Sequence, residues 1–259
     1  MMEVHKEDRV MTLTINRPDV LNAVNNSVFA GLRDGLLEAE SDPGIAVVVL
    51  TGAGRAFCAG ADLGEMKARN SGEKQEKSLF PSALKTVASF RKPLIAAVNG
   101  LGVGFGMTVL SHCDLVLMSS RARLRTPFPQ LGLAPEAGSS CSFARVMGWQ
   151  NAAYTLMSGR WFDAQECLRM GLVWRVCEPD DLMNETLQVA RELAANPVPS
   201  LVATKELMLA SGRSTEVIAA HEREAAAYAS LLGAPANKEA VQAFLEKRQP
   251  DFESIPGLQ

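Results

Sequence analysis

The sequence of 259 residues has no long apolar run, which limits its possible classes. No run approaches the roughly 20 apolar residues that a membrane-spanning helix requires, so we expect no membrane segment. The first ten residues lack the apolar stretch of a secretory signal peptide, and the last residues do not resemble a peroxisomal targeting signal. We therefore expect a cytoplasmic protein.

Metal-type cysteine patterns and an excess of positive charge are also missing. The five cysteines have none of the spacings of a zinc site, so we expect free thiols in a reducing compartment and no metal. The net charge is −3, with 26 Lys and Arg against 29 Asp and Glu. This balance argues against nucleic acid or an anionic membrane as the main partner.

Strand-like and helix-like segments alternate in the first half of the chain. Residues 10–15 (VMTLTI) alternate in polarity and predict a strand, paired in a hairpin with the segment near Val4. The continuous apolar runs at 46–50 and 94–98 are typical of strands buried on both faces, and residues 114–118 (DLVLM) predict a third strand. With helical spacing between them, these runs indicate the α/β class.

The last part of the chain has a different pattern. From about residue 200 onward, the spacing of apolar residues is helical and no strand signal occurs. We therefore divide the chain into an α/β core at 1–199 and a C-terminal helical region at 200–259.

Two glycine-rich loops carry the first indication of chemistry. Residues 51–63 and 99–106 each follow a buried strand, a position that presents unpaired backbone N–H groups. Two such loops can converge on one oxygen and form an oxyanion hole, although both could also be plain tight turns. The spacing Gly102, Gly104, Gly106 differs from a dinucleotide fingerprint, so we do not expect NAD.

Several segments resemble the crotonase (enoyl-CoA hydratase/isomerase) family. Residues 56–63 (AFCAGADL) and 99–106 (NGLGVGFG) are similar to its two signature segments. The resemblance continues through 113–115, 159–160, 164–167, 171–173 and 243–250. It implies a crotonase-like spiral of β-β-α turns with a C-terminal helical trimerisation region. It also implies homotrimers, or hexamers made of two trimers.

The resemblance further implies the substrate and the residues that hold it. The substrate would be an acyl-CoA thioester, with no separate cofactor because coenzyme A is part of the substrate. The oxyanion donors would be the backbone N–H groups of Ala61 and Phe105. The residues that would lie along the substrate and its coenzyme A are Asn22, Ala23, Ala59, Gly60, Ala61, Asp62, Leu63 and Phe105.

Hydration is not the chemistry that the acidic residues favour. Classical hydratases of this family have two glutamates, at positions that match Thr108 and Phe128 here. Adding water to a conjugated double bond requires water activation and protonation of carbon, which two carboxylates usually share. Thr and Phe cannot do this, so we expect an isomerase rather than a hydratase.

One acid, Glu136, suits an isomerase. Moving a double bond from the 3- to the 2-position needs a single base that takes a proton from C2 and returns it to C4. Residues 125–140 resemble peroxisomal-type Δ3,Δ2-enoyl-CoA isomerases, in which the glutamate matching Glu136 is that base; Ala134 and Ala137 depart from the pattern. Alternatively, Glu136 follows Pro135 simply to stabilise a helix N-terminus.

Other functions remain open at this point. The same scaffold supports hydration, hydrolysis and ring isomerisation of aromatic acyl-CoA. The chain also resembles the crotonase-like domain of chromodomain-Y-like proteins, a coenzyme A-binding module with little catalysis. Retention of Glu136 favours an enzyme. We expect structural roles for Cys58, Asp62 and His112.

Overall fold

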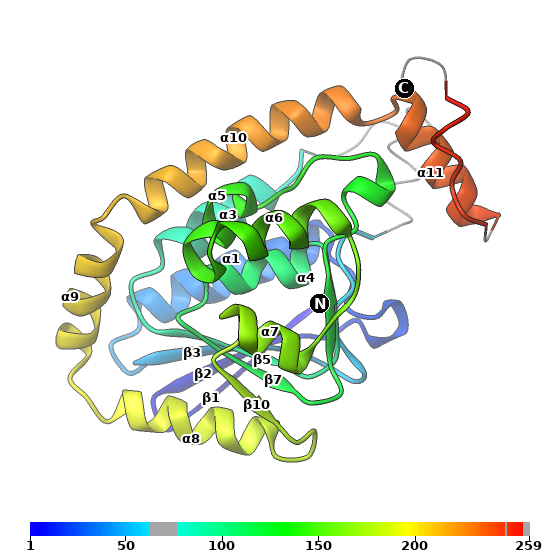
Figure 1. Ribbon diagram of the computed structural model, residues 1–259. Coiled ribbons are helices and arrows are strands. Elements are labelled where there is room, and N and C mark those ends of the chain that lie inside the picture. The colour runs from blue at the N-terminus through cyan, green and yellow to red at the C-terminus, as the bar shows by residue number, and fades with distance from the viewer. Residues whose placement is uncertain (63–76, 247, 256–259) are drawn as a thin grey trace.

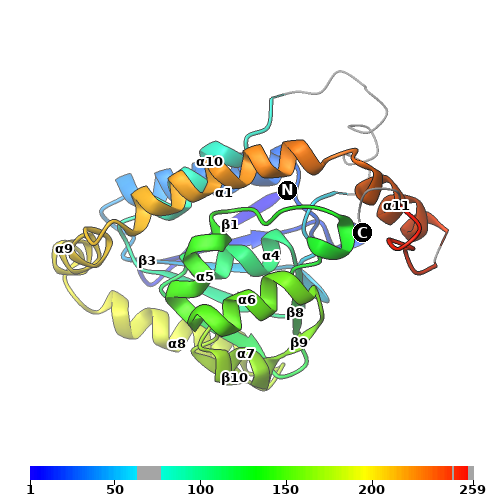
Figure 2. The same cartoon turned by 45° about the horizontal axis from the view of Figure 1, so that its top comes forward.

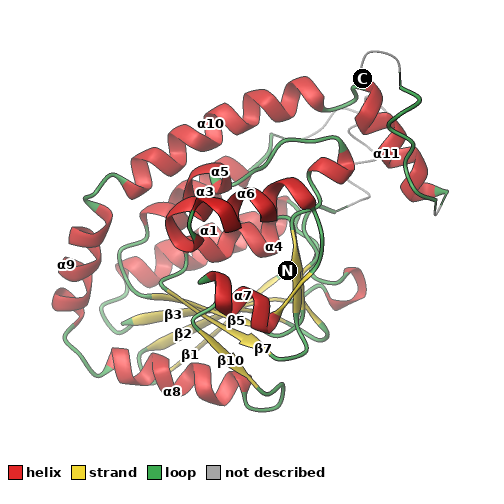
Figure 3. Ribbon diagram, in the orientation of Figure 1, coloured by secondary structure: helices red, strands yellow, loops and turns green. Residues whose placement is uncertain are grey.

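The computed structural model describes residues 1–62, 77–246 and 248–255. It confirms the α/β class, with strands in the interior and helices around them (Figures 1 and 3). Leu63, one of the residues expected along the substrate, lies outside the described residues.

The strands of the described residues form two sheets. The larger sheet has the order β1 (Met2–Glu7), β2 (Val10–Ile15), β3 (Val47–Gly52), β5 (Leu94–Val98), β7 (Leu115–Ser119) and β10 (Arg175–Cys177). The smaller sheet has the order β4 (Ala56–Cys58), β6 (Leu101–Val103), β8 (Arg123–Arg125) and β9 (Phe162–Asp163). β1 and β2 form the expected antiparallel hairpin, in which Val4 pairs with Leu13, and β8 and β9 are also antiparallel. The other neighbouring strands are parallel.

Three consecutive strand pairs build both sheets at once. β3 is followed by β4, β5 by β6 and β7 by β8; the first strand of each pair joins the larger sheet and the second joins the smaller one. The two glycine-rich segments therefore each contain a short strand, β4 or β6, which the sequence interpretation treated as loop. At the joint between β5 and β6, a Cβ on Gly100 would lie 2.1 Å from the Arg55 carbonyl oxygen, so only glycine fits.

Helices cover the two faces of the larger sheet. In the described part of the chain before residue 200, the α-helices are α1 (Asn26–Ser41), α3 (Phe80–Ser89), α4 (Phe105–Thr108), α5 (Ser139–Met147), α6 (Trp149–Ser158), α7 (Ala164–Met170), α8 (Leu182–Ala194) and the beginning of α9 (Val198–Leu209). Alternate residues of β3 belong to different cores: Val47 and Val49 pack with residues of α8, and Val48 and Leu50 with residues of α1. Burial on both faces explains the continuous apolar run of this strand.

The C-terminal region is helical, as the sequence predicts. α10 (Arg213–Leu231) lies over α3 and α5, and α11 (Pro235–Leu245) follows at the end of the molecule (Figure 2). The expected boundary after residue 199 falls in the first turn of α9, and α8 before it packs on the larger sheet.

The described residues contain no helix long and apolar enough to cross a membrane. Within the same residues, no group of three or more His, Cys, Asp and Glu side chains is placed to hold a metal ion. All five cysteines are free thiols.

Candidate active site

The first glycine loop is fixed to the segment that precedes α1. The Val24 N–H donates to the Gly60 carbonyl at 2.8 Å, and the Asp62 N–H donates to the Val24 carbonyl at 3.2 Å. Gly60 has a φ of +80°, a conformation that favours glycine. Between these two bonds, the Ala61 N–H has no acceptor among the residues that the structure describes.

The second glycine loop reaches the same place at the start of α4. Gly104 has a φ of +53°, and its carbonyl accepts from the N–H groups of Met107 and Thr108 at 2.9 Å each. The Phe105 N–H, on the first residue of the helix, has no acceptor within the described part of the chain. A Cβ on Gly104 would lie 4.0 Å from the Gly60 Cα, so the two loops are in contact.

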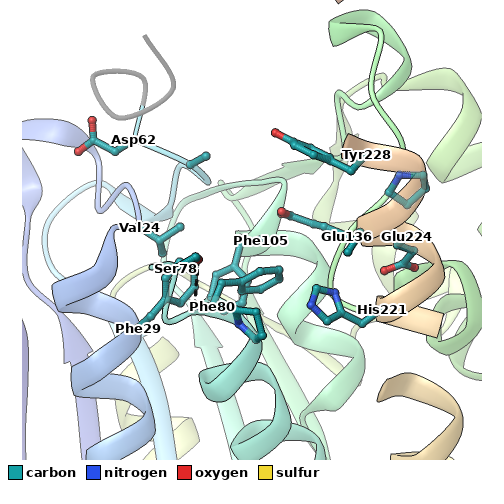
Figure 4. A pocket seen from close by; sticks show the side chains of 14 residues that line it. Val24, Phe29, Asp62, Ser78, Phe80, Phe105, Glu136, His221, Glu224 and Tyr228 are labelled. Carbon is teal, nitrogen blue, oxygen red and sulfur yellow. Dashed lines mark hydrogen bonds between the residues drawn. The ribbon is translucent and has the colours of Figure 1, made fainter. Parts of the chain in front are cut away.

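A cavity of about 240 Å³ opens beside these loops (Figure 4). It contains the three residues expected to be catalytic, namely Ala61, Phe105 and Glu136. Its lining consists of Val24, Phe29, Ala61, Asp62, Ser78, Phe80, Pro81, Phe105, Pro135, Glu136, His221, Glu224, Ala225 and Tyr228. The fold thus gathers residues from the two glycine loops, α1, α3, the turn before α5, and α10.

Glu136 faces the point where the two glycine loops meet. The distance from its Oε1 to an ideal Cβ built on Gly104 is 3.5 Å, so nothing separates this carboxylate from the second loop. Glu136 is partly exposed, toward the cavity, and no donor among the described residues bonds to its carboxylate. Burial and, secondly, the nearby carboxylate of Glu224 raise the pKa of Glu136 to about 7.

Glu224 holds the turn that carries Glu136. It lies on α10, is 5% exposed, and accepts from the N–H groups of Gly138 at 2.6 Å and Ser140 at 2.8 Å. The turn needs this support because Ala137 has a φ of +61°, which L side chains rarely adopt. Both oxygens of Glu224 are thus occupied, which leaves Glu136 as the carboxylate open to a substrate.

Asp62 is turned away from Glu136 (Figure 4). Its Oδ2 accepts from Arg17 Nη2 at 3.0 Å, and Arg17 Nη1 donates to the Ala23 carbonyl at 2.6 Å. Asp62 therefore ties the first glycine loop to the preceding segment, in line with the structural role expected for it.

Asn22 is buried and supports the same loop from behind. It is 0% exposed, and its amide donates to the carbonyls of Ala53 at 2.8 Å and Ala56 at 2.7 Å. Ala23 is also buried, whereas Ala59 is partly exposed and Ala61 exposed. Of the residues expected along coenzyme A, Ala59, Ala61 and Asp62 thus offer surface, and the side chain of Asn22 shapes the loop.

The two positions at which hydratases have glutamates lie outside the cavity lining. Thr108 is 0% exposed, and its hydroxyl donates to the Phe105 carbonyl at 3.5 Å. Phe128 is 5% exposed and apolar. Neither position presents a carboxylate.

His112 and Cys58 have the structural roles that the sequence predicts. His112 Nε2 lies 2.8 Å from the Ala137 carbonyl, and burial lowers the pKa of this imidazole to about 4. Burial raises the pKa of the Cys58 thiol to about 12, so it is not a nucleophile near neutral pH.

Sequence reasoning missed the contribution of α10 to the cavity. His221, Glu224 and Tyr228 all line it. Their i, i+3, i+7 spacing places them on one face of a helix, which is a signal that the sequence offers. Nothing in that spacing shows that this face lies over the glycine loops.

Comparison with known proteins places the chain in a family. Residues 5–255 match the family model described as Enoyl-CoA hydratase/isomerase. A short-chain-enoyl-CoA hydratase of Clostridium acetobutylicum is 34% identical over 248 residues, 95% of each chain. A 1,2-epoxyphenylacetyl-CoA isomerase of Escherichia coli is 34% identical over 255 residues, 96% of each chain. A solved enoyl-CoA hydratase/isomerase from Pseudoalteromonas atlantica is similar with a TM-score of 0.90 and 38% identity, covering 97% of this chain and 99% of that one.

The chain therefore belongs to the enoyl-CoA hydratase/isomerase (crotonase) family, and the predicted crotonase-like fold is confirmed. It is an acyl-CoA enzyme of that family. Its relatives carry both hydratase and isomerase names. Membership of the family therefore does not decide between hydration and isomerisation.

Proposed function

We propose that this protein is a Δ3-to-Δ2-enoyl-CoA isomerase in which Glu136 is the single proton-shuttling base. The observation that carries the proposal is the position of Glu136. Its carboxylate is the one in the cavity that is bound neither to a cation nor to backbone N–H groups, within the described residues, and it faces the junction of the two glycine loops.

The proposed reaction moves one proton and one double bond. The carboxylate of Glu136 removes a proton from C2, the electrons shift so that the 3,4 double bond becomes a 2,3 double bond, and the carboxylic acid returns the proton to C4. Negative charge develops on the thioester oxygen between these steps. The N–H groups of Ala61 and Phe105 would stabilise it, and such a donor is typically worth roughly 10²–10³ in rate.

The pKa of Glu136 suits this role. At about 7, the side chain is partly ionised at neutral pH and is a stronger base than an ordinary glutamate. The same group can return the proton to C4, because a carboxylic acid with a pKa near 7 also donates a proton at neutral pH. Hydration would require a second acid or base, and neither Thr108 nor Phe128 supplies one.

The test is an ultraviolet assay for conversion of 3-hexenoyl-CoA to the conjugated 2-enoyl-CoA, with hydration of 2-hexenoyl-CoA measured beside it. We expect isomerisation without comparable hydration. Glu136→Gln should keep the fold and coenzyme A binding and lose at least 10²-fold in isomerisation. Glu222→Gln, an exposed glutamate on α10, is the matched control and should keep the activity.

Other results would assign other functions. Efficient hydration would make the chain a hydratase, the name that the Clostridium acetobutylicum relative carries. Normal isomerisation by Glu136→Gln would remove Glu136 as the base. Tight binding of acyl-CoA without either reaction would indicate a specialised substrate, such as an aromatic acyl-CoA, or a non-catalytic binding module.

We also propose the setting in which this reaction occurs. Coenzyme A would enter as part of the substrate, so the enzyme would need no separate cofactor and no metal. We propose that the protein acts in the cytoplasm as a homotrimer or as a hexamer of two trimers, with the C-terminal helices in the subunit contacts.

A further inference from the structure

His221 is a polar residue of the cavity that the proposed reaction does not use. Its Nδ1 is buried without a hydrogen-bond partner, and its Nε2 makes no hydrogen bond to any residue that the structure describes. Buried polar groups in proteins are nearly always hydrogen-bonded, and leaving one unpaired is unfavourable. The Nδ1 atom is closed off from the cavity, so a substrate would meet this imidazole at Nε2, which leaves one nitrogen of a cavity-lining histidine for a group of the substrate.

The aromatic residues around the cavity show which part of a substrate would meet this imidazole. The ring centroids of Phe105 and Phe80 are 5.9 Å apart, and those of Phe80 and His221 are 5.1 Å apart. In both pairs the planes of the two rings are nearly perpendicular. Phe105 carries one of the proposed thioester donors. His221 is thus one aromatic ring beyond the reacting end, on the α10 side of the cavity where Glu136 also points inward (Figure 4). The acyl carbons beyond the reacting double bond would reach it.

The charges around His221 define the group that it can bind. Burial lowers the pKa of this imidazole, although the carboxylates of Glu224 and Glu222 oppose the effect. A neutral imidazole has one N–H donor and one acceptor nitrogen. Glu136 and Glu224 line the cavity on the side where His221 lies (Figure 4), so a further negative charge on the substrate would be repelled there.

We propose that His221 forms a subsite for a neutral oxygen, a hydroxyl or carbonyl, on the distal carbons of the acyl group. The preferred substrates would be short acyl-CoA thioesters that carry such an oxygen, rather than plain aliphatic or ω-carboxylated ones. This inference rests on the proposed placement of the thioester at Ala61 and Phe105. It does not depend on which reaction follows.

Binding of saturated analogues tests the subsite separately from catalysis. Dissociation constants would be measured by calorimetry for hexanoyl-CoA, 6-hydroxyhexanoyl-CoA and adipoyl-CoA, which differ only at C6. We expect the hydroxylated compound to bind roughly tenfold more tightly than hexanoyl-CoA, as for a buried hydrogen bond that is otherwise unmade, and adipoyl-CoA to bind most weakly.

Variants assign the effect to His221. His221→Leu should abolish the preference for the hydroxyl compound, and His221→Gln, which keeps a donor and an acceptor, should retain most of it. His5→Leu, a change at an exposed histidine of β1, should leave it intact. Because the readout is a ratio within each variant, a general loss of affinity does not mimic the result.

Equal or tighter binding of hexanoyl-CoA by the unmodified protein would overturn the proposal, as would an unchanged preference in His221→Leu. Tightest binding of adipoyl-CoA would show that the subsite takes an anion, which also contradicts it. Absence of isomerase activity together with the expected binding preference would refute the proposed reaction and leave the subsite standing.

Discussion

At the scale of one residue, burial makes Glu136 a stronger base than an ordinary glutamate. Its carboxylate is surrounded by the cavity wall and by a second carboxylate, Glu224, and it has no hydrogen-bond donor among the described residues. Both surroundings disfavour the ionised form and raise the pKa. The carboxylate form of Glu136, which the proposed reaction requires, is therefore less stable in the folded protein than in water. The base thus lowers the stability of the folded protein.

Glu136→Gln is accordingly expected to stabilise the protein at alkaline pH. The folded-state pKa of about 7 exceeds the ordinary value of 4.5, so between these values the folded protein retains a proton that the unfolded chain has released. The free energy of unfolding then falls as pH rises through this window, and glutamine avoids the loss because it stays neutral. At pH 8 we expect the variant to be more stable by on the order of 1–3 kcal/mol, with little difference at pH 4.

Urea unfolding of both proteins at pH 4 and pH 8 measures this difference. Glu222→Gln, at an exposed position, should show no pH-dependent gain. A gain of equal size at both pH values would mean that packing rather than charge is responsible.

The residues of the candidate site differ in how far sequence alone identifies them. Ala61 and Phe105 could be named because they follow glycines in segments that resemble the two signature segments of the family. Glu136 could be named because residues 125–140 resemble isomerases in which the matching glutamate is the base. His221 could not, because a histidine on one helical face gives no information about the surface that the face covers.

At the scale of elements, the N-terminus of α4 depends on the backbone of Gly104. Its φ of +53° and ψ of −114° are strained for any residue with a Cβ. Gly104→Ala should therefore cost roughly 1–2 kcal/mol of stability and, by moving the Phe105 N–H, reduce isomerase activity at least tenfold. Activity assays and thermal unfolding measure the two effects.

Gly148, between α5 and α6, provides the matched control. It also has a positive φ, of +78°, and a Cβ there would meet nothing within 4 Å. Gly148→Ala should lose similar stability and keep its activity. If both variants retained full activity, the Phe105 N–H would not be an oxyanion donor.

The contact between α10 and the turn before α5 gives a pH-dependent prediction. In the unmodified enzyme the base must be ionised, so kcat/KM should rise with pH through about 7. Glu224→Gln removes the neighbouring negative charge, which should lower the pKa of Glu136 and move this limb to lower pH. Its amide can no longer accept from both Gly138 and Ser140, so kcat should fall as well.

A pH series of kcat/KM for Glu224→Gln and for the control Glu222→Gln distinguishes the two effects. A purely structural role for Glu224 would lower the rate and leave the limb in place. That result would contradict the proposed electrostatic influence on Glu136.

The sequence predicts the long strands and misses the short ones. The strands at 10–15, 46–50, 94–98 and 114–118 were predicted to within one or two residues, because five or six consecutive positions carry a periodicity. The second sheet was missed. Its strands are two or three residues long and two of them lie within glycine-rich segments, so their pairing follows from tertiary structure rather than from local preference.

At the scale of the whole molecule, large apolar side chains remain on the surface of the C-terminal region. Leu207 and Met208 on α9 are 77% and 58% exposed. Exposed apolar side chains of this size mark subunit contacts in many proteins. Their position within residues 200–259 fits the proposal that this region holds the oligomer together, which the sequence could suggest only through family resemblance.

Leu207→Glu should therefore weaken the oligomer. A buried carboxylate in a subunit contact is strongly unfavourable, whereas the same residue on the surface of a monomer is harmless. We expect the unmodified protein to have the mass of a trimer or hexamer by light scattering and the variant to dissociate at micromolar concentration. Leu37→Glu, at a position that is 50% exposed on α1 outside this region, should keep the native mass. An unmodified protein that is monomeric, or a Leu207→Glu variant with native mass, would place the subunit contacts elsewhere or exclude them.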